Sequence, residues 1–266
     1  MEKGKVREQQ VPMESVYPIT IGPDYRFIRT DLLYGIYSTI AYSFFVVVVG
    51  WGFFGIVGKH RIEGKEKLRS LKKKGFITVA NHCHIFDTIM TAKVFYPRLA
   101  WFASVQRNFE APFYRKLFPM LRAFPIPDGP LGLRRITKPV VEAVKDGKIV
   151  HLFPEAELWH LYQGIGFFQR GAFYLAHAAG CPVVPMVHLF KPRAFFGKPV
   201  SRNVLTIKTV VGDPVYPEVP AGEGGKVDLD SVTRMCDAVR QWMEAEVVKY
   251  HGKAVGTEET DENGDA

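Results

Sequence analysis

The most apolar part of the chain lies near its N-terminus. Residues 32–58 contain no charged side chain, and residues 44–54 read FFVVVVGWGFF. As one helix this run would be roughly 40 Å long, which exceeds the ~30 Å hydrocarbon core of a bilayer and the usual buried helix of a soluble protein. It therefore predicts a membrane segment, formed either by one helix or by a helical hairpin that turns near Gly50 or Gly52.

Beyond residue 75 the hydrophobic pattern alternates between two periods. Short apolar runs typical of strands cover residues 76–80, 100–105, 123–126, 149–153, 183–187 and 204–211. Segments typical of helices lie at about 87–96, 110–120, 134–146, 168–179 and 229–249. Strands that alternate with helices predict an α/β fold, with a mostly central mixed β-sheet flanked by helices.

These patterns divide the chain into three parts. Residues 1–58 form an N-terminal segment with the membrane anchor, residues 59–252 the folded domain, and residues 253–266 an acidic tail that we expect to be disordered. Basic residues follow the apolar run at once: Lys59, Arg61, Lys65, Lys67, Arg69, Lys72, Lys73 and Lys74. By the positive-inside rule they predict a cytoplasmic folded domain, a signal that Arg26 and Arg29 on the other flank weaken.

The charge of the chain favours an anionic partner. The formal net charge is +8, and the last nine residues hold five acidic and no basic side chains, so the rest of the chain carries +13. A lipid surface or a phosphorylated ligand suits this excess, and we expect no nucleic-acid partner because no arginine-rich run is interleaved with aromatic residues. Three cysteines, Cys83, Cys181 and Cys236, are too few for a disulfide framework.

The first cluster of candidate chemistry follows the strand expected at residues 76–80. Residues 81–87 read NHCHIFD and contain a base, His82, and a carboxylate, Asp87. A carboxylate that orients an imidazole makes it a competent proton acceptor, which enzymes that activate hydroxyl groups require. The cluster begins where a buried strand ends, and open α/β sheets place their sites at such ends.

A second carboxylate follows another expected strand. Residues 149–153 are apolar apart from His151, and Pro154 and Glu155 come directly after them. If this strand neighbours the one at residues 76–80, then His82, Asp87 and Glu155 meet at one edge of the sheet. Taken alone, Glu155 would suit a structural capping role equally well.

Together these blocks resemble the glycerolipid acyltransferases, the family of 1-acylglycerol-3-phosphate acyltransferases and tafazzin. The resemblance rests first on NHxxxxD at residues 81–87 and FPE at residues 153–155, about seventy residues apart. Three further blocks agree: RAFPI at residues 122–126, FQRGA at residues 168–172 and CPVVP at residues 181–185. Blocks in this order behind an apolar segment are a specific signal, which covers about residues 55–217.

The resemblance implies acyl transfer from a thioester, either acyl-CoA or acyl carrier protein, to the hydroxyl of a lipid at the membrane. His82 would be the general base, oriented by Asp87, and Glu155 would bind the glycerol backbone of the acceptor. Because the thioester is already activated, we expect no metal and no cofactor beyond this co-substrate. The acceptor that the family suggests first is 1-acylglycerol-3-phosphate, which gives phosphatidate.

The chain departs from the family pattern at two positions that usually favour an anionic acceptor. The middle block usually carries an arginine where Asp128 stands, and FPE usually continues as GTR where residues 156–158 read AEL. Four arginines are candidates to hold an acceptor phosphate instead: Arg122, Arg134, Arg135 and Arg170. If none of them does, the acceptor is another lysophospholipid or lipid alcohol.

Three alternatives stay open on the sequence. The first is tafazzin-like transacylation between a phospholipid and a lysophospholipid, which needs no thioester. The second is a non-catalytic homologue that binds lipid, which the altered Asp128 and Ala156 positions suggest. The third is a zinc site that uses His82, His84 and Asp87, for which the sequence offers no evident further ligand.

Overall fold

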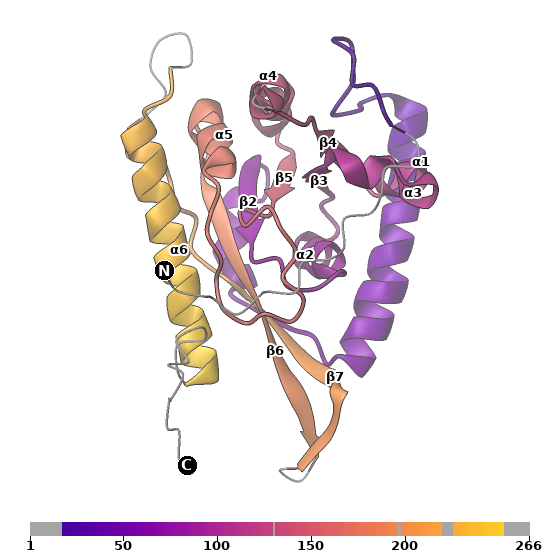
Figure 1. The fold of residues 1–266 in the computed structure, drawn as a ribbon, viewed down its shortest axis with the longest axis vertical. Coiled ribbons are helices and arrows are strands. Elements are labelled where there is room, and N and C mark those ends of the chain that lie inside the picture. The colour runs from indigo at the N-terminus through magenta and orange to yellow at the C-terminus, as the bar shows by residue number, and fades with distance from the viewer. Residues whose placement is uncertain (1–17, 130, 196–197, 220–225, 253–266) are drawn as a thin grey trace, which may run out of the picture.

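The core of the protein is a seven-stranded β-sheet (Figure 1). The computed structural model describes residues 18–129, 131–195, 198–219 and 226–252, and its sheet has the order β1-β7-β6-β2-β5-β3-β4. The strands are β1 (Arg61–Glu63), β2 (Phe76–Ala80), β3 (Ala100–Val105), β4 (Ala123–Ile126), β5 (Ile149–Leu152), β6 (Val183–Phe195) and β7 (Lys198–Val211). Only β6 and β7 pair in antiparallel fashion among these strands, which confirms the expected mixed sheet.

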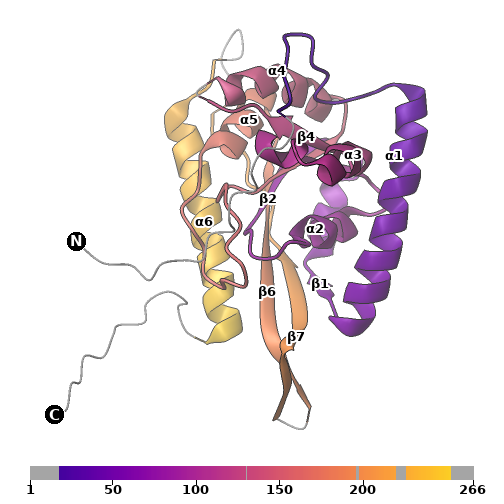
Figure 2. The ribbon, with the colours of Figure 1, turned by 45° about the vertical axis from the view of Figure 1, so that its right-hand side comes forward.

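Helices cover both faces of this sheet (Figures 1 and 2). One face packs against α4 (Gly132–Lys145), α5 (Gly171–Ala179) and α6 (Leu229–His251). The other face packs against α2 (Asp87–Phe95) and the helix formed by α1 (Leu32–Phe45) and the π-helix η1 (Val46–Val57). The remaining helices are η2 (Lys65–Leu71), η3 (Gln106–Phe109) and α3 (Pro112–Met120). The α/β fold predicted from the alternating pattern is therefore confirmed.

Each buried strand supplies side chains to both layers. On β2, Ile77 and Val79 pack with the α4–α6 layer, whereas Phe76 and Ala80 pack with the α2 layer. This alternation follows from the two-residue period of a strand. It explains why β2 is apolar at almost every position rather than at every second one.

The apolar N-terminal run is one continuous helix rather than a hairpin. It extends from Leu32 to Val57 and is the one helix of the described residues that is long and apolar enough to cross a membrane by length and composition. Its buried positions recur every fourth residue and form a single stripe: Tyr34, Ser38, Tyr42, Val46, Gly50 and Phe54. The remaining sides are exposed and apolar, for example at Leu33, Ile40 and Ile56. The helix therefore lies lengthwise along the folded domain.

The segment before this helix also packs on the folded domain. Ile21 and Phe27 are buried in the same cluster as the strands and α4–α6. Arg135 on α4 donates to the carbonyl oxygens of Ile21 and Gly22 at 2.7 and 2.6 Å. The tail at residues 253–266 and residues 1–17 lie outside the described residues, and the expected domain boundaries remain predictions.

The expected elements and the observed ones differ mainly at their ends. Three strands, β2, β3 and β4, have the expected bounds, whereas β6 and β7 form a hairpin that extends beyond the helical layers (Figure 2). The short strand β1 was not expected, because two of its three residues, Arg61 and Glu63, are charged and exposed. It adds to the sheet through backbone pairing with β7.

Candidate active site

The sheet brings the two polar blocks to the same level of one edge. β2 and β5 are parallel neighbours, and Thr78 on β2 is paired with His151 on β5. His82 follows Thr78 by four residues, and Glu155 follows His151 by four. Both blocks therefore leave the sheet at the carboxyl ends of adjacent strands, as expected for the site of an open α/β sheet.

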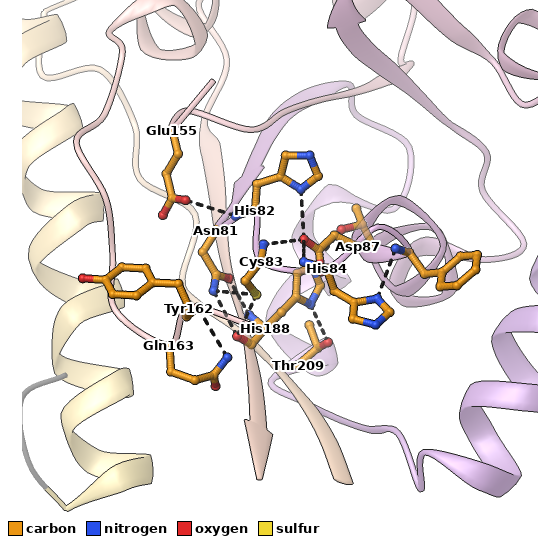
Figure 3. A network of polar contacts seen from close by, with 12 residues as sticks. Asn81, His82, Cys83, His84, Asp87, Glu155, Tyr162, Gln163, His188 and Thr209 are labelled. Atoms are coloured by element: carbon orange, nitrogen blue, oxygen red, sulfur yellow. Dashed lines mark hydrogen bonds and ion pairs between the residues drawn. The ribbon is translucent and has the colours of Figure 1, made fainter. Parts of the chain in front are cut away.

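His82 and Asp87 form a hydrogen-bonded pair at this edge (Figure 3). His82 Nδ1 lies 3.0 Å from Asp87 Oδ2. The same carboxylate oxygen accepts the backbone N–H groups of Cys83 at 2.7 Å and His84 at 2.8 Å. A carboxylate only accepts hydrogen bonds, so it holds the proton of His82 on Nδ1 and leaves Nε2 with a free lone pair.

The turn that joins β2 to α2 creates this arrangement. Asp87 is the first residue of α2, and its backbone N–H donates to the His84 carbonyl at 3.0 Å. The turn thereby folds back, so that the N–H groups of Cys83 and His84 point at the Asp87 carboxylate. Negative charge at a helix N-terminus is also stabilised by the helix dipole. Asp87 itself is fully buried.

The ring of Phe153 fixes the plane of the His82 imidazole. The two rings are stacked, with centroids 4.0 Å apart and planes 12° from parallel. Phe153 belongs to the FPE block, so one block positions the base of the other. The side chain of His82 is 23% exposed, in contrast to its buried partner Asp87. The imidazole is therefore accessible from solvent, whereas the carboxylate is not.

Glu155 lies against the backbone of the same turn. Its Oε1 accepts the N–H of Gly166 at 3.0 Å, and its Oε2 lies 3.4 Å from the backbone nitrogen of His82. Burial raises the pKa of Glu155 to about 7, although these two backbone N–H groups and His82 act in the opposite direction. Near neutral pH this carboxyl group can consequently both donate and accept hydrogen bonds.

We expect Glu155 to make the folded protein less stable as the pH rises. The unfolded chain releases this proton near pH 4.5 and the folded chain near pH 7, so raising the pH across this window favours unfolding, by up to about 3 kcal/mol. Glu155→Gln should remove this loss. Denaturant titrations of both proteins at about pH 5 and pH 8 measure it. Glu142→Gln, at an exposed position of α4, is the matched control and should leave the wild-type loss in place.

Comparisons with known proteins indicate the family of this chain. A family model described as "Acyltransferase" matches residues 59–189, a range that contains both the His82–Asp87 pair and Glu155. The chain belongs to the glycerolipid acyltransferase family. It is 27% identical over 225 residues to a 1-acyl-sn-glycerol-3-phosphate acyltransferase of Pseudomonas aeruginosa, which covers 74% of this chain and 83% of that protein. The chain is accordingly an O-acyltransferase.

A solved structure is also similar to this acyltransferase. It is the crystal structure of the 1-acyl-sn-glycerophosphate (LPA) acyltransferase PlsC from Thermotoga maritima, with a TM-score of 0.48 and 17% sequence identity. The alignment covers 80% of this chain and 97% of that one.

Arg122 does not lie beside the His82–Asp87 pair of this acyltransferase. Across the sheet, Ala123 is level with Thr78. Arg122 comes one residue before Ala123, whereas His82 comes four residues after Thr78. The two residues are therefore about 16 Å apart along the strand direction. The Arg122 guanidinium instead contacts the N-terminal helix, where it donates to Thr39 Oγ1 at 3.1 Å. The family pattern suggested this residue, but sequence spacing could not give its height on the sheet.

The other three candidate arginines divide into two kinds. Arg135 is occupied by the carbonyl oxygens of Ile21 and Gly22 and ties the N-terminal segment to α4. Arg134 is exposed in the first turn of α4, and Arg170 is the exposed residue that precedes α5. Helix N-termini that follow parallel strands lie at the carboxyl edge of the sheet. These two arginines are thus the ones placed at the edge that carries His82.

The residues after Glu155 pack on the turn that joins β2 to α2. The backbone N–H of Trp159 donates to the His82 carbonyl at 2.9 Å, and that of Leu161 donates to the Cys83 carbonyl at 2.7 Å. The loop leaves Glu155 through Ala156, whose φ of 59° lies in the left-handed region. Such a φ costs a residue with a Cβ about 1 kcal/mol relative to glycine. Where the family pattern has glycine, this acyltransferase therefore keeps the turn with a strained alanine.

His84 and Cys83 lie in the same turn as His82. His84 Nδ1 accepts the backbone N–H of Phe86 at 3.2 Å, and burial lowers the pKa of the His84 ring. Cys83 is buried, and burial raises the pKa of its thiol well above the usual range, so a reactive thiolate is disfavoured. Among the described residues, no three of His, Cys, Asp and Glu are grouped to hold a metal ion. The metal-free reaction remains a prediction.

Proposed function

We propose that this acyltransferase moves a fatty acyl group from an acyl thioester, acyl-CoA or acyl carrier protein, to the hydroxyl of a lysophospholipid. The acceptor we favour is 1-acylglycerol-3-phosphate, with phosphatidate as the product. The observation that carries the proposal is the His82–Asp87 pair, with its free Nε2 at the carboxyl edge of the sheet. The name of the Pseudomonas relative supports this acceptor.

The proposed reaction forms one carbon–oxygen bond, breaks one carbon–sulfur bond and moves one proton from the hydroxyl oxygen to the sulfur. His82 Nε2 takes the proton of the acceptor hydroxyl while the oxygen attacks the thioester carbonyl carbon. Asp87 stabilises the imidazolium that forms, because it is buried and already bonded to Nδ1. When the carbon–sulfur bond breaks, His82 returns the proton to the leaving sulfur. The products are an oxygen ester and a free thiol, and His82 is neutral again.

Glu155 is the proposed contact for the glycerol part of the acceptor. It lies at the level of His82, and its partly protonated carboxyl group can bond a second hydroxyl or an ester oxygen. Arg134 and Arg170 are the proposed contacts for an acceptor phosphate, since they lie at the same edge of the sheet and are exposed. Arginine binds phosphate through paired, charge-assisted hydrogen bonds.

We further propose that the apolar helix rests along the membrane surface, with the catalytic domain on the cytoplasmic side. The buried stripe from Tyr34 to Phe54 spans about 30 Å of helix, the full thickness of a hydrocarbon core. Tyr34 donates to the Pro119 carbonyl of α3 at 2.7 Å, and Phe54 packs on Phe86 beside α2. An upright helix would pull α2 and the charged α3 into hydrocarbon, which costs several kcal/mol per charge.

Labels on the exposed side of this helix should all report the same shallow depth. Each native cysteine is buried, so a single introduced cysteine can be labelled selectively. We expect fluorophores at Leu33→Cys, Phe44→Cys and Ile56→Cys to be quenched equally by shallow nitroxide lipids in vesicles. The control Leu229→Cys, at an exposed position of α6, should stay unquenched. A deeper Phe44 label than the two flanking ones would indicate an upright span instead.

The substrate proposal is tested by mass spectrometry of purified protein with a panel of lysolipids and acyl donors. With acyl-CoA or acyl-loaded acyl carrier protein as the donor, we expect 1-acylglycerol-3-phosphate to be acylated faster than lysophospholipids with choline, ethanolamine or glycerol head groups. Preference for another lysolipid would overturn the acceptor. Acyl exchange among lipids without any thioester would favour the transacylase, and binding without turnover by any donor would overturn the enzymatic proposal.

A further inference from the structure

His188 on β6 contacts both segments that carry the His82–Asp87 pair. We infer that His188 is a positioning residue that holds these two side chains in register, an inference that rests on the acyl transfer proposed above. His188 is fully buried, and its ring lies against α2, beside the turn that joins β2 to α2. It reaches the pair through Asn81 on one side and Thr91 on the other.

On the strand side, the Asn81 side chain pairs with the backbone of His188 (Figure 3). Asn81 Oδ1 accepts the His188 N–H at 2.7 Å, and Asn81 Nδ2 donates to the His188 carbonyl at 3.0 Å. These two bonds continue the β2–β6 pairing beyond its last step, at Ala80 and Met186. They hold the side chain of Asn81, the residue directly before His82, through the backbone of His188 rather than through its ring.

On the helix side, the ring of His188 contacts α2. His188 Nε2 lies 3.1 Å from Thr91 Oγ1. Thr91 follows Asp87 by four residues, so both side chains lie on the same face of α2 in consecutive turns. The contact at Thr91 therefore sets the rotation of α2 that aims Asp87 at His82.

A buried polar network keeps the His188 ring in place. His188 Nδ1 lies 2.9 Å from Thr209 Oγ1, which in turn lies 2.8 Å from His60 Nε2. Burial lowers the pKa of both histidines, to about 3 for His60, so both rings are neutral. If each group donates to the next in one direction along Thr91, His188, Thr209 and His60, all three contacts are hydrogen bonds. The ring of His188 thus cannot rotate without breaking bonds at both nitrogens.

His177 provides a comparison within the same chain. It is also fully buried, on α5 at the opposite face of the sheet. Neither of its ring nitrogens has a hydrogen-bond partner among the described residues. In this protein a histidine ring can therefore be buried without hydrogen bonds, so burial alone does not explain the hydrogen bonds of the His188 ring.

Two conservative variants separate the contacts of His188. The amide nitrogen of glutamine overlaps the position of Nε2, which faces Thr91, whereas that of asparagine overlaps Nδ1, which faces Thr209. We expect His188→Asn to lower kcat about 10- to 100-fold with KM for donor and acceptor unchanged, because misplacement of about 1 Å has such an effect. His188→Gln should recover most of kcat. Thr91→Val, a nearly isosteric change, should reproduce the loss, and His177→Gln should retain wild-type kcat.

A double-mutant cycle distinguishes positioning from a general loss of stability. If His188 acts through Asp87, then His188→Asn should cost little further kcat in an Asp87→Asn protein. Additive losses, equal activities of the Gln and Asn variants, or an effect on KM alone would overturn the inference. If Asp87→Asn itself leaves kcat unchanged, the proposed function fails and this inference fails with it. If Asp87→Asn lowers kcat and the His188 and Thr91 variants do not, this inference alone fails and the proposed function stands.

Discussion

Replacement of His82 by alanine is expected to lower kcat for acyl transfer about 10⁴-fold, at the upper end of general-base catalysis. An alcohol is a poor nucleophile unless a base takes its proton during attack. The free Nε2 of His82 is the group that the site offers for this step, because Nδ1 is bonded to Asp87 and the ring is fixed against Phe153. The assay is thioester-dependent formation of the acylated lysolipid by the purified protein, with initial rates at saturating donor and acceptor.

His84→Ala is the matched control for this experiment. His84 lies in the same turn, but its Nδ1 accepts the Phe86 N–H, which leaves a protonated Nε2 that cannot act as a base. We expect this variant to lose less than about tenfold in kcat. Near-wild-type transfer by the His82→Ala protein, with an unchanged circular dichroism spectrum, would exclude His82 as the base.

The convergence of the two polar blocks depended on one fact that the sequence could not provide. The strands that precede His82 and Glu155 were recognisable from their apolar runs. Whether these strands are neighbours could not be read from the sequence, because strand order is set by long-range packing rather than by local pattern. In the structure β2 and β5 pair directly. The same kind of information was missing for Arg122, whose block begins at the far end of β4.

The choice between a single helix and a hairpin was open for a similar reason. Gly50 suggested a turn, since glycine often interrupts helices. In the structure this residue faces α2, and a Cβ there would lie 3.4 Å from Ile89 Cγ2. Gly50 thus allows close approach of two helices. Composition alone does not separate a glycine that packs from one that turns, because the partner surface lies forty residues further along the chain.

Polar residues in apolar strands were the hardest to interpret from sequence. His151 and His188 both interrupt buried strands and gave no local signal of their environment. The structure shows that His188 is bonded through both ring nitrogens, whereas those of His151 have no partner among the described residues. The difference comes from neighbours on β7 and α2, which are distant in sequence. Roles of this kind require the assembled sheet.

Replacement of Asp87 by asparagine is expected to lower kcat about 10²- to 10³-fold while the pair remains in contact. The N–H groups of Cys83 and His84 both point at Oδ2, so the amide oxygen of asparagine should take that position and keep the Nδ1 proton of His82 in place. What is lost is the negative charge that stabilises the imidazolium, and hence kcat rather than KM. The amide nitrogen would replace Oδ1, which has no hydrogen-bond partner among the described residues, and burial of this unpaired donor should cost about 1–3 kcal/mol of unfolding free energy.

Two measurements on the Asp87→Asn protein separate these effects. Steady-state kinetics should give the loss in kcat with KM nearly unchanged, and denaturant titration should give the loss in stability. Asp237→Asn, the same change at an exposed position of α6, should alter neither. A much larger loss, close to that of His82→Ala, would mean that the amide is turned with its nitrogen toward His82. The imidazole would then carry its proton on Nε2 and could not accept one from the acceptor, so the size of the loss reports the orientation of residue 87 in the site.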